Sequence, residues 1–355
     1  MPAGSVLVTG GAGFIGSAIV DGLLADGHAV RVLDNLHPAA HADKPSYVPD
    51  DVEWLQADVR DPDAVRRAVA GVDAVSHQAA MVGLGVDLGD LPDYVGHNDL
   101  GTAVLLQGLH AAGFDGRLVL ASSMVVYGEG RYRCPVDGLQ PAPPRAAADL
   151  DAGDFEPKCP VCGGPLEPET VPEDAPMDPR NVYAATKLHQ EHLCTAWSRE
   201  TGGSVAALRY HNVYGPRMPR DTPYAGVASI FRSVLAAGKP PRVTEDGAQL
   251  RDFVHVRDVA RANLLALASD VAGPFNVASG TPRSVGEMAR ALHAAMGADA
   301  ATTPQVMGAW RAGDVRHVFA STARIERELG YAPQEDFDAG MAEFAVAQLR
   351  DAPVT

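Results

Sequence analysis

The start of the chain contains a glycine-rich turn between an apolar run and a helical pattern. Ser5–Thr9 has the composition of a buried strand, and Phe14–Ala25 that of a helix. Glycine recurs between them and into the helix at every third position, at Gly10, Gly13 and Gly16. Glycine is needed because the chain turns sharply and its backbone must approach a pyrophosphate, while the N–H groups at the helix start favour negative charge. The pattern predicts a strand–turn–helix unit that binds a dinucleotide.

A carboxylate at the end of the second predicted strand indicates which dinucleotide is bound. Ala29–Leu33 is strand-like, and Asp34 follows it. A carboxylate there would bind the ribose hydroxyls of adenosine and would repel a 2′-phosphate, so NAD is favoured over NADP. The alternative is a glycine turn in another kind of doubly wound sheet.

Apolar runs and helical patterns alternate through the first third of the chain. The predicted strands are Ser5–Thr9, Ala29–Leu33, Val52–Ala57, Ala74–His77, Arg117–Ala121 and, further on, Val205–Arg209. The predicted helices are Phe14–Ala25, Asp63–Ala70, Asn98–Ala111 and a helix from Asn181 to about Glu200. This alternation predicts an α/β fold, a Rossmann domain with a doubly wound parallel sheet and right-handed crossovers.

Changes of pattern divide the chain further. From Glu129 to Pro172 it is rich in Pro, Gly and Ala, which predicts an insertion at the strand ends, and beyond Asn212 short elements broken by prolines predict a smaller C-terminal substrate lobe. Arg251–Val259 and Pro274–Val277 are expected to return to the main sheet. The predicted boundaries are 1–128 and 173–211 for the Rossmann domain, with returning segments near 251–278, 129–172 for a zinc-ribbon-like insertion, and 212–250 and 279–355 for the lobe.

The net charge argues against two kinds of partner. The chain has 29 Lys and Arg against 45 Asp and Glu, a net charge of −16, whereas nucleic acid or an anionic membrane surface requires a basic face. We therefore expect neither partner. The sequence has no apolar run of membrane-spanning length and no cationic, apolar leader, which predicts a cytoplasmic protein.

Two side chains four residues apart are candidates for proton transfer. Tyr183 and Lys187 would share one face of a helix, one turn apart. An ammonium group stabilises a neighbouring phenolate, and a nicotinamide cation would add to this, so a pKa normally about 10 would fall toward neutrality. Ser122 and Ser123 follow the end of a predicted strand, where a hydroxyl could hydrogen-bond the same substrate oxygen. An exposed helix pair without a chemical role is the alternative.

With these residues in view, the chain resembles the extended short-chain dehydrogenase/reductase family, in its branch of NAD-dependent nucleotide-sugar epimerases and dehydratases. The resemblance covers nearly the whole length and implies an enzyme that acts on a sugar attached to a nucleoside diphosphate. The motifs that carry it are Thr9–Gly16, Asp34–Leu36, Ala57–Val59, His77–Ala80, Asn98 with Gly101 and Thr102, Ser122–Gly128, Tyr183 with Lys187, Arg209–Pro216, Arg251–Asp258 and Arg311–Asp314.

The resemblance also implies roles for individual residues. The catalytic group would be Tyr183, Lys187 and Ser123, and Arg251 and Arg311 would clamp the substrate phosphates as planar bidentate groups. His211 would touch the nicotinamide, with a structural histidine as the equal alternative. The cofactor-binding set is Gly10, Gly13, Phe14, Ile15, Gly16, Asp34, Asn35, Asp58, Val59, Ala79, Asn98, Ser122, Tyr183, Lys187 and His211. The substrate-binding set is Ser123, Met124, Tyr183, Asn212, Arg251 and Arg311.

The residues before the Val-Tyr-Gly turn narrow the reaction. In related enzymes, sugar 4,6-dehydratases carry an Asp-Glu pair there, decarboxylases a glutamate and 3,5-epimerases a cysteine. Met124 and Val125 stand in those places, and neither can exchange a proton. The resemblance thus implies a 4-epimerase, in which Tyr183 takes the proton of the sugar 4-hydroxyl, the 4-keto sugar turns over, and NAD is regenerated within one turnover.

Within this branch the chain is most similar to dTDP-L-rhamnose 4-epimerases, which interconvert dTDP-L-rhamnose and dTDP-6-deoxy-L-talose. The expected partner is a dTDP- or UDP-linked sugar. The alternatives are a UDP-glucose or UDP-glucuronate 4-epimerase, a nucleotide-sugar 4-ketoreductase that exchanges its cofactor, and a non-catalytic NAD-sensing or scaffold protein. The family also implies a homodimer through helices 98–111 and 181–200, whose apolar stripes could equally belong to the core.

Two near-copies of one motif in the predicted insertion provide a candidate metal site. They are Cys134-Pro-Val-Asp-Gly138 and Cys159-Pro-Val-Cys-Gly163, each a knuckle in which a glycine turn directs two side chains to one point. Together they supply three thiolates and one carboxylate, suited to a tetrahedral, structural zinc: Cys134, Asp137, Cys159 and Cys162. The alternative is a ribbon that has lost its metal. The remaining cysteine, Cys194, is expected to be a core residue.

Overall fold

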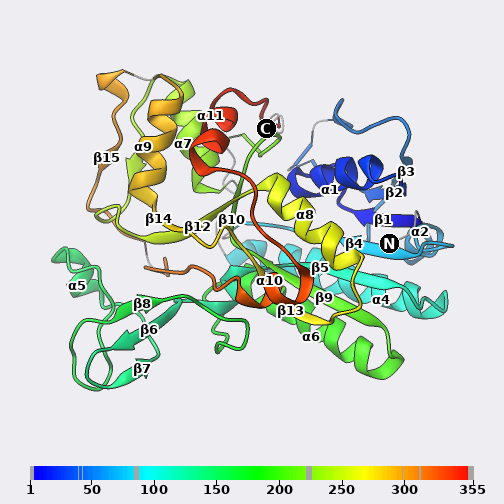
Figure 1. Ribbon diagram of the computed structural model, residues 1–355, viewed down its shortest axis with the longest axis horizontal. Helices are drawn as coiled ribbons and strands as arrows, with labels where there is room; N and C mark the ends of the chain where they lie inside the picture. The colour runs from blue at the N-terminus through cyan, green and yellow to red at the C-terminus, as the bar shows by residue number, and fades with distance from the viewer. Residues whose placement is uncertain are drawn as a thin grey trace.

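The centre of the structure is a parallel seven-stranded sheet in the order β13–β9–β5–β4–β1–β2–β3 (Figure 1). The structure is a computed structural model that describes residues 4–38, 40–41, 43–83, 88–220, 226–297, 299–311 and 313–350. The strands are β1 (Ser5–Thr9), β2 (Ala29–Asp34), β3 (Glu53–Gln56), β4 (Ala74–His77), β5 (Arg117–Ser123), β9 (Ser204–Tyr210) and β13 (Gly273–Val277). The predicted doubly wound parallel fold is confirmed.

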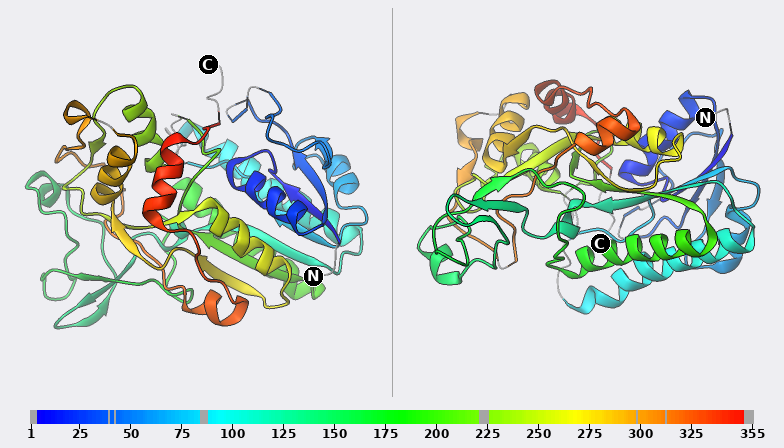
Figure 2. Two further views of the ribbon diagram at one scale, coloured as in Figure 1. Left: turned by 45° about the horizontal axis from the view of Figure 1, so that its top comes forward. Right: turned by 60° about the horizontal axis from the view of Figure 1, so that its bottom comes forward.

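Helices cover both faces of this sheet, so its strands are apolar on both sides. On one face lie α1 (Phe14–Ala25) and α8 (Val256–Leu267), and on the other lie α2 (Pro62–Ala68), α4 (Gly101–Ala111) and α6 (Val182–Thr201) (Figures 1 and 2). The helix ends follow local signals in the sequence. The side chain of Asn181 accepts a hydrogen bond from the backbone N–H of Ala184 (2.8 Å), and Gly202 ends α6 with a φ of 78°.

Several short elements connect strands β4 and β5 to their neighbours. The predicted helix at 98–111 begins earlier than expected and in a different form, because a π-helical segment precedes α4. These elements are η1 (Leu88–Asp90), α3 (Leu91–Tyr94), the π-helical η2 (Val95–Leu100) and η3 (Met124–Tyr127), which directly follows β5.

A second lobe packs beside the carboxyl ends of the main strands (Figure 2). Its sheet is β10 (Asn212–Tyr214), β12 (Leu250–His255) and β14 (Pro282–Ser284), with a small parallel pair, β11 (Arg242–Val243) and β15 (Gln305–Val306). Its helices are α7 (Val227–Ala236), α9 (Val285–Ala295) and α11 (Phe337–Val346), which share one apolar core, with η4 (Ala300–Thr302) after α9. The last helix of the main domain, α10 (Ala323–Leu329), lies against β13.

The sequence pattern assigned one segment to the wrong sheet. Arg251–Val259 was expected to return to the main sheet, but β12 pairs with β10 and β14 instead. The strand ends at His255, whose side chain accepts a hydrogen bond from the N–H of Arg257 and so starts α8. The chain returns to the main domain as that helix, and only the later strand β13 joins the main sheet.

Residues 129–172 form a separate small unit at the edge of the lobe (Figure 1). Its antiparallel sheet is β6 (Arg131–Cys134), β7 (Gly138–Gln140) and β8 (Glu167–Glu169), and α5 (Ala147–Asp151) lies between β7 and β8 in sequence. We call this unit the insertion. Among the described residues, no helix is both long and apolar enough to span a bilayer.

Candidate active site

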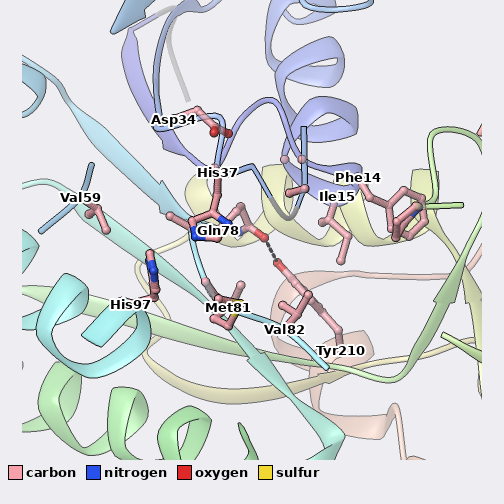
Figure 3. A pocket seen from close by; sticks show the side chains of 18 of the residues that line it. Phe14, Ile15, Asp34, His37, Val59, Gln78, Met81, Val82, His97 and Tyr210 are labelled. Atoms are coloured by element: carbon pink, nitrogen blue, oxygen red, sulfur yellow. Dashed lines mark hydrogen bonds between the residues drawn. The ribbon is translucent and has the colours of Figure 1, made fainter. Parts of the chain in front are cut away.

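A cavity of about 370 Å³ lies at the carboxyl ends of the main strands (Figure 3). This is where parallel sheets bind their ligands, because the strand order reverses there between β1 and β4. Most of the predicted cofactor and catalytic residues line it: Gly10, Gly13, Phe14, Ile15, Gly16, Asp34, Asn35, Asp58, Val59, Ala79, Ser122, Ser123, Tyr183, Lys187 and His211. The fold therefore brings these residues from widely separated segments of the chain to one cavity, and their roles in binding stay predictions.

The glycine turn has the geometry that a phosphate cradle requires. Gly10 has a φ of 70°, which a residue with a side chain rarely adopts. A Cβ on Gly16 would lie 2.2 Å from the carbonyl oxygen of Gly10, so no other residue fits there. Gly13 precedes α1 without a side-chain cap, and the N–H groups at the start of the helix can therefore bind an anion. The residues present fit a dinucleotide pyrophosphate.

Two carboxylates lie at the ends of neighbouring strands in the cavity. Asp34 accepts hydrogen bonds from the N–H groups of Ala12 (3.0 Å) and Leu36 (2.9 Å), and burial raises its pKa despite these bonds. Asp58 is paired with Arg60 (2.8 Å), and this partner holds the pKa of Asp58 well below its usual range. Asp34 thus stands at the position expected for ribose recognition, with its orientation set by the glycine turn itself.

The three catalytic candidates meet on the wall formed by β5 and α6. Ser123 ends β5, and its hydroxyl lies near enough to the phenol of Tyr183 to lower the pKa of that phenol. Lys187, one turn further along α6, is buried and donates a hydrogen bond to the carbonyl oxygen of Ala121 (2.9 Å). Its Nζ lies 6.0 Å from the centre of the Tyr183 ring. The helix spacing and the strand end therefore bring a hydroxyl, a phenol and an amine to one place.

The prediction that the pKa of Tyr183 falls toward neutrality is wrong when only the protein's own side chains act on the phenol. Burial raises the pKa of Tyr183 to about 12, and the neighbouring Ser123 hydroxyl offsets this only in part. Burial lowers the pKa of Lys187 to about 8, although the negative charges of Asp99 and Glu191 act to raise it. For both groups desolvation is the largest cause of the pKa shift, because it disfavours the charged form of each.

One predicted cofactor residue lies behind the cavity wall. Asn98 is buried in η2, and its amide donates to the hydroxyl of Thr186 (2.9 Å) and the carbonyl oxygen of Met81 (3.0 Å). Its carbonyl accepts from the N–H of Met81 (2.8 Å). Asn98 does not line the cavity; it ties the chain after β4 to α6, the helix that carries Tyr183.

The predicted substrate residues do not converge in the same way. Arg251, Arg311, Asn212 and Met124 are all outside the cavity lining. The guanidinium of Arg251 is buried and donates to the carbonyl oxygens of residues 250, 315 and 316 at 2.7–2.9 Å. Arg311 is exposed in the loop before Asp314, and Met124, the first residue of η3, packs against a small apolar cluster. Arg251 therefore holds backbone here and does not present a free fork to a phosphate.

Sequence reasoning missed the wall contributed by the end of the chain. Arg350 lines the cavity and lies near Asp34 and Tyr47, where burial lowers its pKa. It is held in place by backbone hydrogen bonds to Met218 (3.0 Å) and from Arg220 (3.1 Å). No local pattern around residue 350 marks a site, because the contact is made only by the fold.

A polar pair from two strands was also missed. Tyr210 ends β9, and Gln78 directly follows β4. The hydroxyl of Tyr210 donates a hydrogen bond to Gln78 Oε1 (3.1 Å; Figure 3). The resemblance motif included Gln78, but its side chain was given no role. His211, the next residue, is buried, and burial lowers its pKa to about 3, so it is neutral at physiological pH.

Comparison with known proteins agrees with this arrangement. A sequence profile described as "NAD dependent epimerase/dehydratase family" matches residues 6–147 and 159–278. A dTDP-L-rhamnose 4-epimerase from Burkholderia thailandensis is 36% identical over 347 residues, which cover 95% of this chain and 93% of that protein.

Solved structures share the fold across two reactions. UDP-glucose 4-epimerase from Thermus thermophilus, a complex with NAD, has a TM-score of 0.74 and 31% identity, covering 96% of this chain and 97% of that one. A dTDP-glucose 4,6-dehydratase from Streptomyces venezuelae, solved with NAD bound, has a TM-score of 0.77 and 29% identity, covering 96% and 95%. The fold alone therefore does not choose between epimerase and dehydratase. The chain belongs to the NAD dependent epimerase/dehydratase family.

Proposed function

We propose that this chain is an NAD-dependent nucleotide-sugar 4-epimerase that interconverts dTDP-L-rhamnose and dTDP-6-deoxy-L-talose. The observation that carries the proposal is the meeting of Ser123, Tyr183 and Lys187 on a cavity that also contains the glycine turn. The relative from Burkholderia thailandensis supports the choice of nucleotide and sugar.

The cofactor would be held by the cavity residues already described. The turn from Gly10 to Gly16 and the start of α1 would bind the pyrophosphate, Asp34 the adenosine ribose, and Lys187 the nicotinamide ribose. NAD, when bound, supplies a reversible hydride acceptor for the carbinol carbon of the sugar. Asp34 disfavours a 2′-phosphate, which selects NAD over NADP.

The side chains of this protein would manage the proton. Tyr183 Oη would take the proton of the sugar 4-hydroxyl and return it after the 4-keto sugar has turned over. Ser123 would hydrogen-bond the same oxygen, and the Lys187 ammonium would favour the phenolate once a second positive charge is present. Because Met124 and Val125 cannot exchange protons, no side chain at those positions would remove water from the sugar.

Other roles stay predictions and form part of the same proposal. Asn212 and the exposed Arg311 are candidates for binding the diphosphate, whereas Arg251 would act by holding residues 315 and 316. A homodimer through α4 and α6 and a cytoplasmic location remain the expectation from the family resemblance.

The test is a turnover assay without added cofactor. Purified protein is incubated separately with dTDP-L-rhamnose, UDP-glucose and UDP-glucuronate, and proton NMR follows the configuration at carbon 4. We expect the 4-epimer of dTDP-L-rhamnose to form, with no net NADH made or consumed. Turnover of a UDP-sugar alone would replace the assigned substrate, a requirement for added reduced cofactor would indicate a ketoreductase, and no turnover of any sugar would defeat the epimerase proposal.

A further inference from the structure

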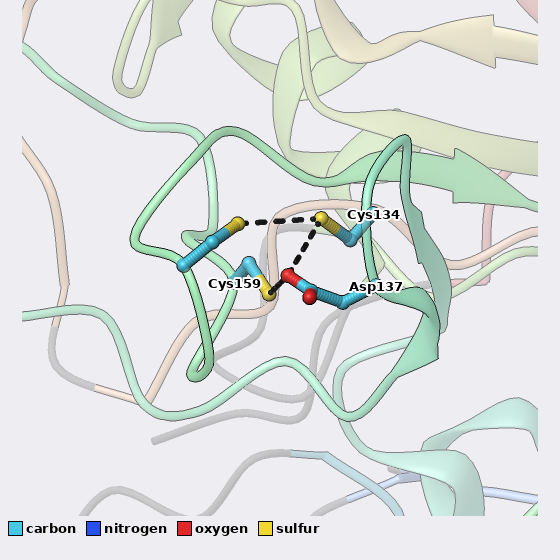
Figure 4. A group of neighbouring side chains, drawn as sticks. Cys134, Asp137 and Cys159 are labelled. Atoms are coloured by element: carbon cyan, nitrogen blue, oxygen red, sulfur yellow. Dashed lines mark hydrogen bonds between the residues drawn. The ribbon is translucent and has the colours of Figure 1, made fainter.

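The two cysteine motifs of the insertion meet at one point, far along the chain from the glycine turn of the cofactor cavity (Figure 4). One ligand atom from each of four residues lies within 4.8 Å of all the others: Cys134, Asp137, Cys159 and Cys162. Cys134 Sγ is 3.5 Å from Cys162 Sγ and 3.3 Å from Asp137 Oδ2, which in turn is 3.2 Å from Cys159 Sγ.

These separations are those of a tetrahedral ion site. With Zn–S bonds near 2.3 Å, two sulfur ligands of a tetrahedral zinc lie roughly 3.8 Å apart, and a sulfur and an oxygen ligand slightly closer. The sulfur atoms of Cys134 and Cys162 are too far apart for a disulfide, whose bond is about 2.05 Å. The cluster is therefore spaced for an ion between the side chains, not for a bond between two of them.

The two turns have the same backbone geometry, which is a second observation independent of the cluster. In each, the N–H two residues after the first cysteine points to its sulfur at 3.4 Å: Val136 to Cys134 and Val161 to Cys159. In each, a glycine with positive φ follows the second ligand, 74° at Gly138 and 71° at Gly163. Backbone N–H groups directed at sulfur stabilise the thiolate form, the form that binds a metal.

The geometry points to a structural zinc site in the insertion, with Cys134, Asp137, Cys159 and Cys162 as a closed tetrahedral set. Three thiolates favour zinc over the hard cations, and four protein ligands leave no open position for catalysis. Each thiol loses its proton to solvent on binding, and no oxidation or reduction takes place.

The weak core of the insertion explains what such an ion would do. Its buried apolar cluster has only five members: Tyr132, Cys134, Ala142, Cys159 and Leu166. Two of these are ligand residues, so the rest of the cluster is too small to fix the fold of the segment alone. Small units of this kind usually depend on a metal or disulfides for their stability.

The site would also fix contacts between the insertion and the lobe. Glu156, three residues before Cys159, pairs with Arg316 (2.6 Å) and His317 (2.9 Å). At the other edge, Tyr132, which lies two residues before Cys134 in β6, accepts a hydrogen bond from the N–H of His317 (3.0 Å). Both ligand-bearing segments therefore contact residues 316–317, and the guanidinium of Arg251 holds the carbonyl oxygens of residues 315 and 316 in the same segment.

The first test measures metal in the protein as purified, without an affinity tag or chelator. Mass spectrometric metal analysis should give about one zinc per chain, and titration with a mercurial should release it. Cobalt(II) loaded in place of zinc should show the visible bands of a tetrahedral, thiolate-bound ion. Iron in place of zinc, or a Cys134–Cys162 disulfide with no metal in protein purified under reducing conditions, would overturn the assignment.

Variants locate the site without relying on activity. Cys162→Ser and Asp137→Asn should reduce bound zinc at least tenfold and increase hydrogen exchange across residues 129–172, while α1 exchanges as in the wild type. Asp154→Asn is the matched control, because Asp154 is an exposed carboxylate of the same insertion that pairs with Lys158. If Asp137→Asn retained zinc while Cys162→Ser lost it, Asp137 would be removed from the ligand set. Retention in both would refute the site.

Discussion

The sheet and the insertion are held together by different forces. The sheet is buried between two apolar clusters, and consecutive residues of a strand, such as Val6–Val8, alternate between the two. The insertion has a small core and is attached to the lobe through ion pairs, Glu156 with Arg316, whose side chain is 1% exposed, and Arg145 with Glu245. Apolar burial resists changes of pH and metal, whereas carboxylates and thiolates respond to both. Substitutions at the cavity should therefore reduce catalysis without releasing the insertion, and loss of the ion pairs should loosen the insertion without unfolding the sheet.

The largest effect is expected for Tyr183→Phe. Losing the phenol of Tyr183 beside Ser123 should reduce kcat by about 10²- to 10⁴-fold, because proton transfer to the sugar oxygen is lost. Stopped assays followed by NMR measure it. Tyr331→Phe, which removes a buried hydroxyl bonded to Ala278 elsewhere, should keep normal activity. If Tyr183→Phe kept more than a tenth of the wild-type activity, Tyr183 would not be the group that transfers the proton.

Lys187→Met should change how stability depends on pH. The folded pKa of about 8 lies below the ordinary 10.5, so the unfolded chain binds more protons between these values. Stability of the wild type should rise through that window relative to the variant, by on the order of 3 kcal/mol. Urea unfolding at pH 7 to 10.5 gives the difference. Lys239→Met, at an exposed position, should show none, and a flat difference for Lys187→Met would mean that the amine is not desolvated.

Asp34→Asn should weaken NAD binding by about 10- to 100-fold, because hydrogen bonds from ribose hydroxyls to a carboxylate are stronger than those to an amide. The N–H groups of Ala12 and Leu36 donate to different oxygens of Asp34, so Asn can keep only one of these bonds, and circular dichroism should confirm that the fold persists. Calorimetry with NAD and NADP measures both affinities, and the preference for NAD should narrow. Asp26→Asn, exposed at the end of α1, is the control. An unchanged preference would remove Asp34 from cofactor selection.

The smallest effect concerns the attachment of the insertion. Burial raises the pKa of Glu156, but bonds from His317 and Arg316 outweigh it and lower the pKa from 4.5 to about 2. A lowered folded pKa stabilises above pH 4.5, and this contribution is lost as the pH falls toward 2. Because Glu156 is 41% exposed, Glu156→Gln should cost less than about 1 kcal/mol.

Trp310 can report this change, since its indole N–H donates to Asp151 of the insertion at 3.0 Å. Its emission, isolated by subtracting a Trp310→Phe variant, should shift between pH 4.5 and 2 in the wild type. In Glu156→Gln the shift should be smaller. An equal shift in both proteins would place the acid response at another group.

Local sequence patterns predicted the main domain, which contains the seven-stranded sheet, well. β1, β4 and α1 have the expected bounds, because each is encoded by its own periodicity and turn residues. The glycine turn, Asp34 and the pair Tyr183–Lys187 were placed correctly in one cavity, since strand ends and helix spacing fix their positions.

The lobe was predicted less well, because its residues are placed by long-range contacts. Arg251 has the residue type of a phosphate ligand, but its guanidinium is taken up by three backbone carbonyls. The partner strands of β12 could not be chosen from its apolar run alone, and Arg350 has no motif. Which groups a side chain meets across the fold is not encoded in its neighbours.

Arg350 makes the two ends of the described chain parts of a single binding site. The glycine turn forms one side of the cavity, and the residue that completes another side comes more than three hundred positions later. Cofactor affinity should therefore be sensitive to trimming from Gln348 onward. For the same reason, a purification tag is better fused ahead of β1 than close behind residue 350, whose side chain forms part of the cavity wall.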